Sequence, residues 1–394
     1  MKTIDYLLFY VIMALYAVFL SETLITSSLY RFMDNVDSKL LTYSTIFLLV
    51  LQIVSLVKWG MVKTKYAKMY CVLIIYIAMV SFIHLTSNAN VNIYKKIFQL
   101  SQSLLPLGIY YFFYNANKQI KPIYIISAIA LITGYVLIAY YNTFEQVAML
   151  SVLEGEDRMS TSYIFMYLLP FFLLQPNRYI KIISFVAVAL LIFTSFKRGG
   201  VLCIVVGGVV YYLVALLVKG NSATFFKIFK WIAFVILFGI GAYYIDQLNG
   251  GVILDRFMSI QDDGGSARDR VYETTWNMIQ KSDLFESLFG HGWNSVVDAS
   301  PMALSAHNDY LEVWYDCGII ALTFFVFFVF KTVRMLKSMI KNNSPYSPVL
   351  ALGLTFFIIN SMVAHVFLYT WYFATFMGSI GYIVSLEETR IYRK

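Results

Sequence analysis

The apolar segments of this chain are long enough to cross a lipid bilayer, and they recur from one end of the sequence to the other. A transmembrane helix needs about 20 mostly apolar residues. Of the 394 residues, 60% are hydrophobic and only 13% are charged, about half the charged share of a soluble domain. Twelve spans are predicted, with approximate bounds Tyr6–Thr26, Leu40–Val57, Met69–Thr86, Ile93–Tyr114, Pro122–Tyr141, Ser160–Gln175, Tyr179–Ser195, Gly200–Val218, Phe226–Ile245, Tyr310–Phe330, Ser347–Ala364 and Val366–Leu386. No stretch is left for a separate soluble domain, so the sequence predicts one all-α, polytopic transmembrane domain over residues 1–394.

Basic residues cluster in every second loop between these spans. With Lys2 and the C-terminal tail, the basic loops hold 19 of the 30 lysines and arginines. Because loops rich in lysine and arginine stay on the cytoplasmic side, both termini are predicted to be cytoplasmic and the alternate loops to face outward. The net charge of +8 is therefore a topology signal, and no nucleic-acid partner is predicted.

The longest outward loop is predicted at residues 248–309 and carries cationic side chains on a short helix. Between residues 267 and 279, apolar and aromatic residues recur with helical spacing, which predicts an amphipathic helix lying on the membrane surface. Arg268 and Tyr272 are four residues apart and share one face of this helix, and Arg270 is close by. Contact with lipid headgroups explains such arginines as easily as substrate binding does.

A second pair of cations lies in the tight hairpin "FTSFKRGG", residues 193–200. Lys197 and Arg198 are basic although this hairpin is predicted to face outward, against the usual charge rule. The two glycines let a ligand approach the backbone closely, and an arginine fork matches phosphate oxygens. Snorkelling to lipid headgroups is the alternative. Because such a pair is less natural on the outward side, a ligand site is favoured.

All four histidines are predicted at or near the outward face: His84, His291, His307 and His365. His84 and His365 lie near helix ends, where a histidine is more often a satisfied interfacial residue than a catalyst. His291 follows a glycine-flanked turn and is interpreted as part of that turn. These three histidines are therefore assigned no chemistry.

His307 differs from the others in its context, "SAHNDYLEVWYDCG", just before the tenth span. A neutral imidazole there can take a proton from an attacking hydroxyl. The alternative is that the histidine is incidental to a helix start, since Ser305, Asn308 and Asp309 all suit an N-cap. Residue chemistry alone does not favour either of these two interpretations.

A base and two groups of cations on one side of a membrane are what transfer from a lipid diphosphate requires. Cations hold the diphosphate and stabilise it as it leaves, and the base activates the acceptor hydroxyl. No DxD motif occurs in the first outward loop, and the adjacent Asp262 and Asp263 are typical of a glycine-rich turn. The sequence therefore predicts chemistry without a metal or a cofactor.

Three motifs, in order along the chain, resemble the O-antigen ligase and O-antigen polymerase superfamily of bacterial surface-polysaccharide glycosyltransferases. "FTSFKRGG" resembles its Ser-Arg-Gly hairpin, with Lys197 where many members have serine. "SARDRVYETTWNMIQKSDLFESLFGHGWNS" resembles the segment that begins with an arginine, here Arg268, and ends in a Gly-x-Gly turn. "SAHNDYLEVWYDCGIIAL" resembles the signature in which ten residues separate a histidine from a glycine, here His307 and Gly318.

The resemblance implies a metal-independent glycosyltransferase of the bacterial cytoplasmic (inner) membrane that acts at the periplasmic face. Its donor would be an undecaprenyl-diphosphate-linked oligosaccharide, and its other partners would be a saccharide acceptor and membrane lipid. By position in the motifs, His307 would be the catalytic base, and Arg198 and Arg268 would bind the donor diphosphate. Lys197 and Arg270 are added to the diphosphate site because they lie beside these arginines.

The acceptor separates the two activities of this superfamily. A polymerase adds the growing chain to another lipid-linked repeat unit, whereas a ligase adds it to the lipid A core. No sequence feature decides between them, and polymerase is favoured because polymerases are the more varied group. Whether a chain-length regulator acts with the enzyme is also open. A transporter of the same lipid-linked sugars is the alternative from another class, which the near absence of charge within the spans disfavours.

Overall fold

The computed structural model describes residues 2–29, 38–60, 65–85, 98, 100–154, 162–195, 198–219, 243–244, 247, 264–301 and 304–392, and the structural statements below concern these residues. Its helices are α1 (Lys2–Leu29), α2 (Lys39–Trp59), α3 (Lys65–Leu85), α5 (Leu105–Gln119), α6 (Pro122–Glu154), α7 (Ile164–Leu173), α8 (Arg178–Thr194), α9 (Arg198–Lys219), α12 (Gly264–Lys281), α13 (Leu284–Phe289), α14 (Ser295–Ala299), α15 (Asp309–Lys341), α16 (Ser347–Val363) and α17 (Thr370–Tyr392). The described residues contain no strand, so the all-α prediction is confirmed for this part of the chain.

Six of the described helices are long and apolar enough to cross a membrane, namely α1, α2, α3, α6, α9 and α15. Helices α7, α8 and α16 are shorter, with 10, 17 and 17 residues. The predicted span Phe226–Ile245 lies almost wholly outside the described residues. The predicted span Ile93–Tyr114 overlaps α5, which begins only at Leu105, because Pro106 has no N–H and suits the first turn of a helix. The count of twelve spans and the single-domain organisation stay predictions.

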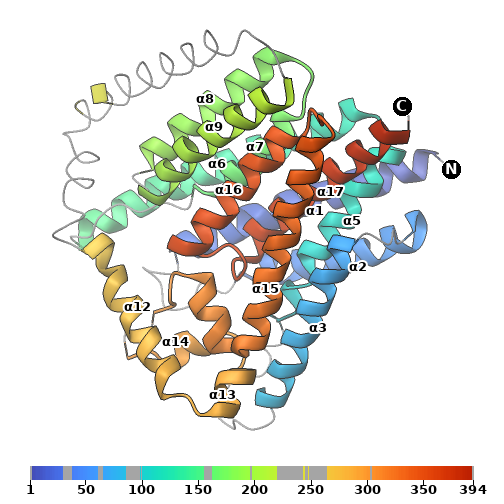
Figure 1. The fold of residues 1–394 in the computed structure, drawn as a ribbon. Helices are drawn as coiled ribbons and strands as arrows, with labels where there is room; N and C mark the ends of the chain where they lie inside the picture. The colour runs from blue at the N-terminus through green and yellow to red at the C-terminus, as the bar shows by residue number, and fades with distance from the viewer. Residues whose placement is uncertain are drawn as a thin grey trace.

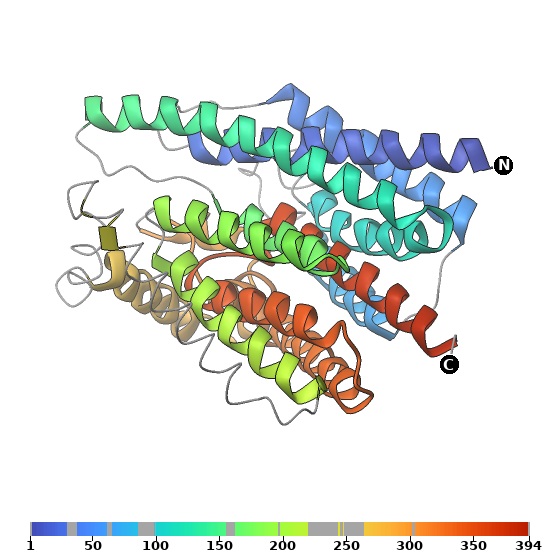
Figure 2. The same cartoon turned by 90° about the horizontal axis from the view of Figure 1, so that it is seen from above.

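The bundle buries a central group of helices between two outer groups (Figures 1 and 2). Helices α1, α2 and α6 pack together on one side, and α9, α15 and α16 pack together on the other. Between them, α5, α7 and α17 are buried on nearly every face, as expected for helices that are apolar all round. Helices α17 and α5 approach closely at Gly381, where a Cβ atom would overlap the carbonyl oxygen of Tyr110.

Large apolar side chains are exposed on the outside of this bundle. Ile53 of α2, Leu131 of α6 and Ile183 of α8 are 61%, 73% and 67% exposed. Water-soluble monomers rarely expose extensive apolar surface, whereas lipid tails cover such surface without cost. Together with the six long apolar helices, this surface is that of an all-α membrane protein.

Helix α12 contains the segment that was predicted as an amphipathic helix, and its apolar face is covered by protein. Val271, Thr275 and Ile279, spaced four residues apart, are all buried. Ile279 packs in a small cluster with side chains of α14 and α15. The rings of Trp276 and Trp314 are nearly perpendicular, with their centroids 5.5 Å apart. The helix is therefore confirmed, and much of the face that was expected to rest on the membrane surface contacts α14 and α15 instead.

Helix α15 is interrupted at Gly318, where the backbone adopts φ 78° and ψ 171°. The carbonyls of Tyr315 and Asp316 just before the break accept hydrogen bonds from the backbone N–H groups of His291 and Gly292, at 3.0 and 2.7 Å. A Cβ atom at Gly318 would overlap the carbonyl oxygen of Leu288, so the two backbones touch. The segment between α13 and α14 thus satisfies polar groups that the break leaves without a helical partner.

The two ends of the bundle differ in what they contain. Both chain ends lie at one end, here named the terminal end, with Asp5 of α1 and Glu387 of α17 (Figure 1). Helices α12–α14 and the start of α15 lie at the opposite end, here named the histidine end, which contains His307 and His365. The candidate functional site therefore lies at the histidine end.

Candidate functional site

The C-terminal end of α16 joins the three motif segments. The carbonyl of Met362 accepts a hydrogen bond from the Tyr272 hydroxyl of α12 at 2.8 Å and one from Asn308 Nδ2, before α15, at 3.2 Å. The neighbouring Val363 side chain lies 3.2 Å from the position that a Cβ atom would take on Gly199, at the start of α9. Segments that are more than 100 residues apart in the sequence thus meet around one helix end.

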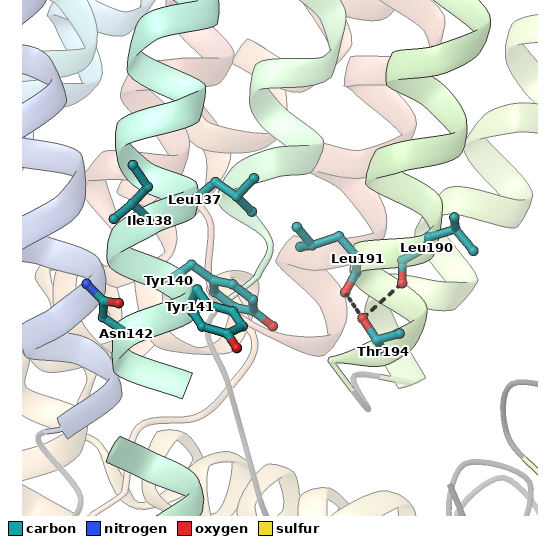
Figure 3. Close-up of a pocket in the computed structure, with 8 residues that line it drawn as sticks. All are labelled: Leu137, Ile138, Tyr140, Tyr141, Asn142, Leu190, Leu191 and Thr194. Carbon is teal, nitrogen blue, oxygen red and sulfur yellow. Dashed lines mark hydrogen bonds between the residues drawn. The ribbon is translucent and has the colours of Figure 1, made fainter. Parts of the chain in front are cut away.

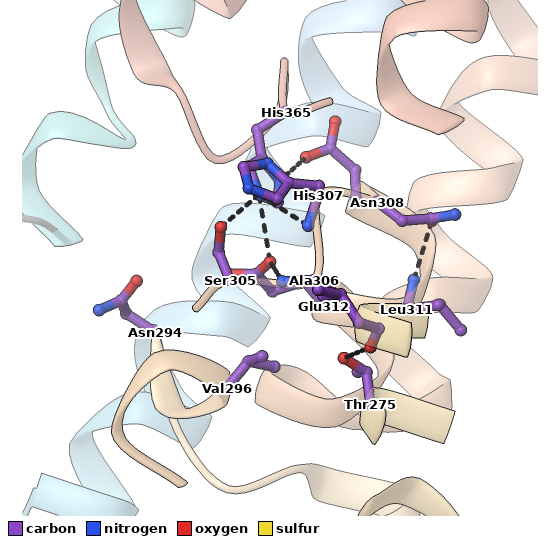
Figure 4. A network of polar contacts seen from close by, with 12 residues as sticks. Thr275, Asn294, Val296, Ser305, Ala306, His307, Asn308, Leu311, Glu312 and His365 are labelled. Carbon is purple, nitrogen blue, oxygen red and sulfur yellow. Dashed lines mark hydrogen bonds and ion pairs between the residues drawn. The ribbon is translucent and has the colours of Figure 1, made fainter. Parts of the chain in front are cut away.

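His307 lies in a constrained turn at this meeting point (Figure 4). Its φ of 50° is in the left-handed region, which residues other than glycine seldom adopt. Its N–H donates to His365 Nε2 at 3.1 Å, and its carbonyl accepts from the Tyr272 hydroxyl at 3.4 Å. The two imidazole rings stack with their centroids 5.3 Å apart and their planes 29° apart. The half-buried His307 is therefore held from both sides of its backbone.

The helix start after His307 is capped by a different residue. Asn308 has extended backbone angles, and its Oδ1 accepts from the N–H groups of Tyr310 and Leu311 at 3.0 and 3.2 Å. Asn308 is therefore the N-cap of α15, and His307 takes no part in the cap. The interpretation of His307 as incidental to a capping run does not account for its conformation.

Two buried carboxylates surround His365 in the break between α16 and α17. Asp309, 0% exposed, accepts from the backbone N–H groups of Val366 and Phe367, both at 2.9 Å, and its Oδ1 lies 3.3 Å from His365 Nδ1. Glu312 Oε2 accepts from the Ala306 N–H at 2.9 Å and lies 3.4 Å from His365 Nε2. Burial by itself lowers the pKa of His365, but the charges of Glu312 and Asp309 outweigh it and leave this pKa above its ordinary value.

A third buried carboxylate, Asp316, fixes the loop that precedes the site. Its two oxygens accept from the backbone N–H groups at the start of α14, those of Asn294, Ser295 and Val296, at 2.7, 2.9 and 3.0 Å. A carboxylate at a helix N-terminus satisfies N–H groups that have no partner within the helix. Asp316 thereby ties the segment before His307 to the helix that follows it.

Arg268 is a predicted cation that lies near enough to His365 for its charge to act on it. It is half-buried on α12, and its charge acts electrostatically on His365 and on Tyr163, the residue before α7. Burial raises the pKa of Tyr272, one turn further along α12, and the positive charge of Arg268 opposes this rise. Arg268 and Tyr272 therefore share one face, as their spacing predicted, and this face is turned toward the site.

The other predicted cations are placed differently. Arg198, half-buried, begins α9, and a Cβ atom on the next residue, Gly199, would lie 3.1 Å from the Tyr163 hydroxyl oxygen. Tyr163 thus stands between the start of α9 and Arg268. Arg270 is exposed, because two residues after Arg268 it points roughly 200° away around the helix. Lys197 lies outside the described residues.

The motif region is similar to a known protein family. Residues 183–326 match the family model described as O-antigen ligase. The resemblance drawn from the three motifs is thereby confirmed, and this family consists of glycosyltransferase-like membrane enzymes. No curated protein matches the chain.

The matched region comprises most of α8, all of α9 and α12–α14, and the first half of α15, and so contains every predicted site residue. His365 and the end of α16 lie outside it. Sequence analysis gave His365 no chemistry, yet its ring is 1% exposed and touches the turn that carries His307. One signal was available in the sequence, since His365 alone separates two predicted apolar spans. Asp309 and Glu312 were missed because buried acids cannot be distinguished from helix-capping acids by sequence.

A groove between α6 and α8 opens beside the α8–α9 hairpin (Figure 3). Its volume is about 500 Å³, and its lining is almost entirely apolar. The lining residues are Leu137, Ile138, Tyr140, Tyr141, Asn142, Leu190, Leu191 and Thr194. Thr194, one of the lining residues, ends α8 four residues before Arg198, the first residue of α9.

Among the described residues, no three or more histidine, cysteine, aspartate or glutamate side chains form a group that could hold a metal ion. His291 belongs to another contact, in which its ring stacks on Tyr315 at 4.0 Å and lies 3.4 Å from Glu286. The described side chains at the site are the imidazoles of His307 and His365, with buried carboxylates beside His365, and arginines near the starts of α9 and α12. Catalysis without a metal stays a prediction.

Proposed function

We propose that this protein is a membrane glycosyltransferase that polymerises undecaprenyl-diphosphate-linked oligosaccharide repeat units into a surface polysaccharide at the periplasmic face of the inner membrane. The observation that carries the proposal is the convergence of three helix starts on the end of α16: those of α9 with Arg198, α12 with Arg268 and α15 with His307. This convergence lies within the O-antigen ligase match, apart from α16 itself. It also lies at the end of the bundle opposite to both termini, as the proposed topology with cytoplasmic termini requires.

The proposed reaction uses His307 as the base. Its imidazole takes the proton of the acceptor hydroxyl while the hydroxyl oxygen attacks the anomeric carbon of the donor sugar. The bond between that carbon and the diphosphate oxygen breaks, and the diphosphate leaves with both electrons of the bond. Arg198 and Arg268 bind the diphosphate and stabilise its charge. Lys197 and the exposed Arg270 contribute positive charge around them.

The lipid tail of the donor fits the groove between α6 and α8. A polyisoprenyl chain requires an apolar path, and the groove supplies one whose lining includes Thr194, four residues before Arg198 in the sequence (Figure 3). A donor with its tail in this groove would present its diphosphate to the start of α9. The arginines would then anchor the charged part of a substrate whose remaining length lies in the bilayer.

The ligase activity is the second candidate, and the description of the matched family favours it. Both activities use the same donor and differ in the acceptor, which is a lipid-linked repeat unit or the lipid A core. A deletion strain separates them. Single repeat units on the core would indicate a lost polymerase, whereas bare core with accumulating lipid-linked polymer would indicate a lost ligase. Accumulation of unpolymerised repeat units on the cytoplasmic side would instead support the transporter alternative.

Replacement of the base tests the mechanism. His307→Ala should lower sugar transfer by about 10²–10⁴-fold, the usual contribution of a general base, while membrane insertion and thermal stability stay near those of the wild type. The measurement is polymer formation from purified lipid-linked repeat units in detergent micelles. His291→Ala removes another half-buried histidine from the same end of the molecule and should retain activity. Full transfer by the His307 variant would refute the assignment of the base.

A further inference from the structure

The His365 ring is enclosed by groups from the turn before α15 and from the first turn of α15 (Figure 4). Its Nε2 lies 3.1 Å from the His307 backbone nitrogen, 2.9 Å from Ser305 Oγ and 3.4 Å from Glu312 Oε2. Its Nδ1 lies 3.3 Å from Asp309 Oδ1. Both ring nitrogens therefore have partners. The partners of Nε2 belong to the turn that carries the proposed base and to the helix that follows it.

The backbone of His307 needs such a partner. A left-handed conformation costs a residue other than glycine about 1 kcal/mol or more and persists only where its surroundings impose it. The His307 N–H lies before the start of α15 and has no place in the hydrogen bonds of that helix. His365 supplies the acceptor for this N–H from the break between α16 and α17, 58 residues later in the chain.

Asp309 fixes which nitrogen of His365 can accept. The Asp309 carboxylate is held by the N–H groups of Val366 and Phe367, the two residues that follow His365. It therefore receives the Nδ1 proton of His365, which leaves Nε2 unprotonated and able to accept from His307. A carboxylate that orients an imidazole in this way fixes both its tautomer and the direction of its ring.

We propose that neutral His365 is a positioning residue, which holds His307 in its left-handed conformation so that the His307 ring meets the acceptor hydroxyl. This inference rests on the proposed role of His307 as the base. Protonation of His365 at Nε2 would place two N–H groups against each other across 3.1 Å and would break the hydrogen bond to His307. The positioning is therefore lost when His365 gains a second proton.

The groups around His365 set the pH at which this happens. Asp309 and Glu312 of α15 are the negative charges that face it, Arg268 of α12 is a positive charge, and His307 and Tyr369 contact its ring. The carboxylates keep the pKa of His365 above its ordinary value of 6.5. Transfer should therefore decline in mildly acidic conditions, starting above pH 6.5, as His365 becomes charged.

The test compares His365→Gln and His365→Ala with the control His291→Gln in the purified full-length protein. Glutamine keeps an oxygen acceptor near the position of Nε2 but cannot be protonated. We expect His365→Ala to lower kcat by roughly 10- to 100-fold, the usual effect of a displaced catalytic group, with little change in KM for the donor. His365→Gln should keep most of kcat, and its acidic decline should move to lower pH. An unchanged kcat and pH profile in both variants would overturn the inference.

Hydrogen–deuterium exchange provides a readout that does not depend on transfer. Exchange in the peptide 304–312 should be faster in His365→Ala than in the wild type and close to the wild type in His365→Gln. If the wild type transfers no sugar, the proposed function fails while this measurement still tests the positioning. If His365→Ala does not fold, the comparison of His365→Gln with His291→Gln decides, because only the former should shift the acidic decline. Equal exchange in all four proteins would refute the positioning role.

Discussion

Both ends of the bundle contain carboxylates, but these carboxylates have different partners. At the terminal end, Glu387 contacts Arg390 at 2.5 Å, and Asp5 contacts Lys58 at 2.8 Å. At the histidine end, Asp309 and Glu312 accept hydrogen bonds from backbone N–H groups and face His365. Asp316 likewise accepts three backbone N–H groups at the same end.

The two kinds of carboxylate contact have different roles. An ion pair between a carboxylate and an arginine or lysine keeps its charges throughout the physiological pH range, and it fixes helices to one another. A carboxylate bonded to backbone amides instead fixes the course of the chain, and Asp309 and Glu312 also lie beside an imidazole that can titrate. The terminal end is therefore built to hold helices together, whereas the histidine end holds a turn in one conformation and tunes a proton site.

The largest expected effect comes from removal of one carboxylate at each end. Asp309→Ala leaves two buried N–H groups without an acceptor, each costing about 1–3 kcal/mol, and releases His365. The protein should lose several degrees of thermal stability and most of its transfer activity. Glu387→Ala should also cost about 1–3 kcal/mol, because the buried Glu387 accepts from Ser344 Oγ at 2.6 Å and pairs with Arg390, but activity per folded molecule should be unchanged. Thermal unfolding and transfer assays on the same preparations measure the stability and the activity of both variants. Equal losses of activity in Asp309→Ala and Glu387→Ala would contradict the proposed difference between the two ends.

A smaller effect is expected from the two arginines of α12. Arg268→Gln should raise KM for the lipid-linked donor by roughly 10- to 100-fold, since a hydrogen bond to a charged group contributes about 1.5–3 kcal/mol. Arg270→Gln removes the same charge two residues away on the exposed face and should change KM only a few-fold, through long-range attraction. Initial rates at varied donor concentration give both values. Equal KM values for the two variants would show that charge alone, and not the orientation of Arg268, serves the donor.

The smallest effect concerns stability against pH. Because the pKa of His365 is raised in the folded protein, the stability that its protonation contributes is fully present below pH 6.5 and is lost as pH rises through the folded pKa. The unfolding midpoint of the wild type should therefore fall modestly above pH 6.5, and that of His365→Gln should fall less. A midpoint in His365→Gln that follows the wild type at every pH would exclude His365 as the titrating group.

Local sequence patterns account for much of the histidine end. The four-residue spacing of Arg268 and Tyr272 placed them on one face, since a helix repeats every 3.6 residues. Gly318 could be recognised as special from its motif, and the structure gives the physical reason: the backbone there has a positive φ and touches Leu288. The helix start after His307 was also predicted, although its N-cap was one of three candidates.

The sequence by itself determined that this protein is a membrane-embedded helical bundle with candidate chemistry near His307, because apolar length and helical spacing are properties of neighbouring residues. Only the tertiary structure decided that His365 contacts His307 and that Asp309 faces the residues after His365. These contacts join positions 56 to 58 residues apart. They depend on how α15, α16 and α17 cross, and a pattern of hydrophobic residues specifies which face of a helix is buried but not which partner covers it. The position of the proposed base could thus be predicted from a sequence motif, whereas the contacts that support its conformation depend on how the helices pack.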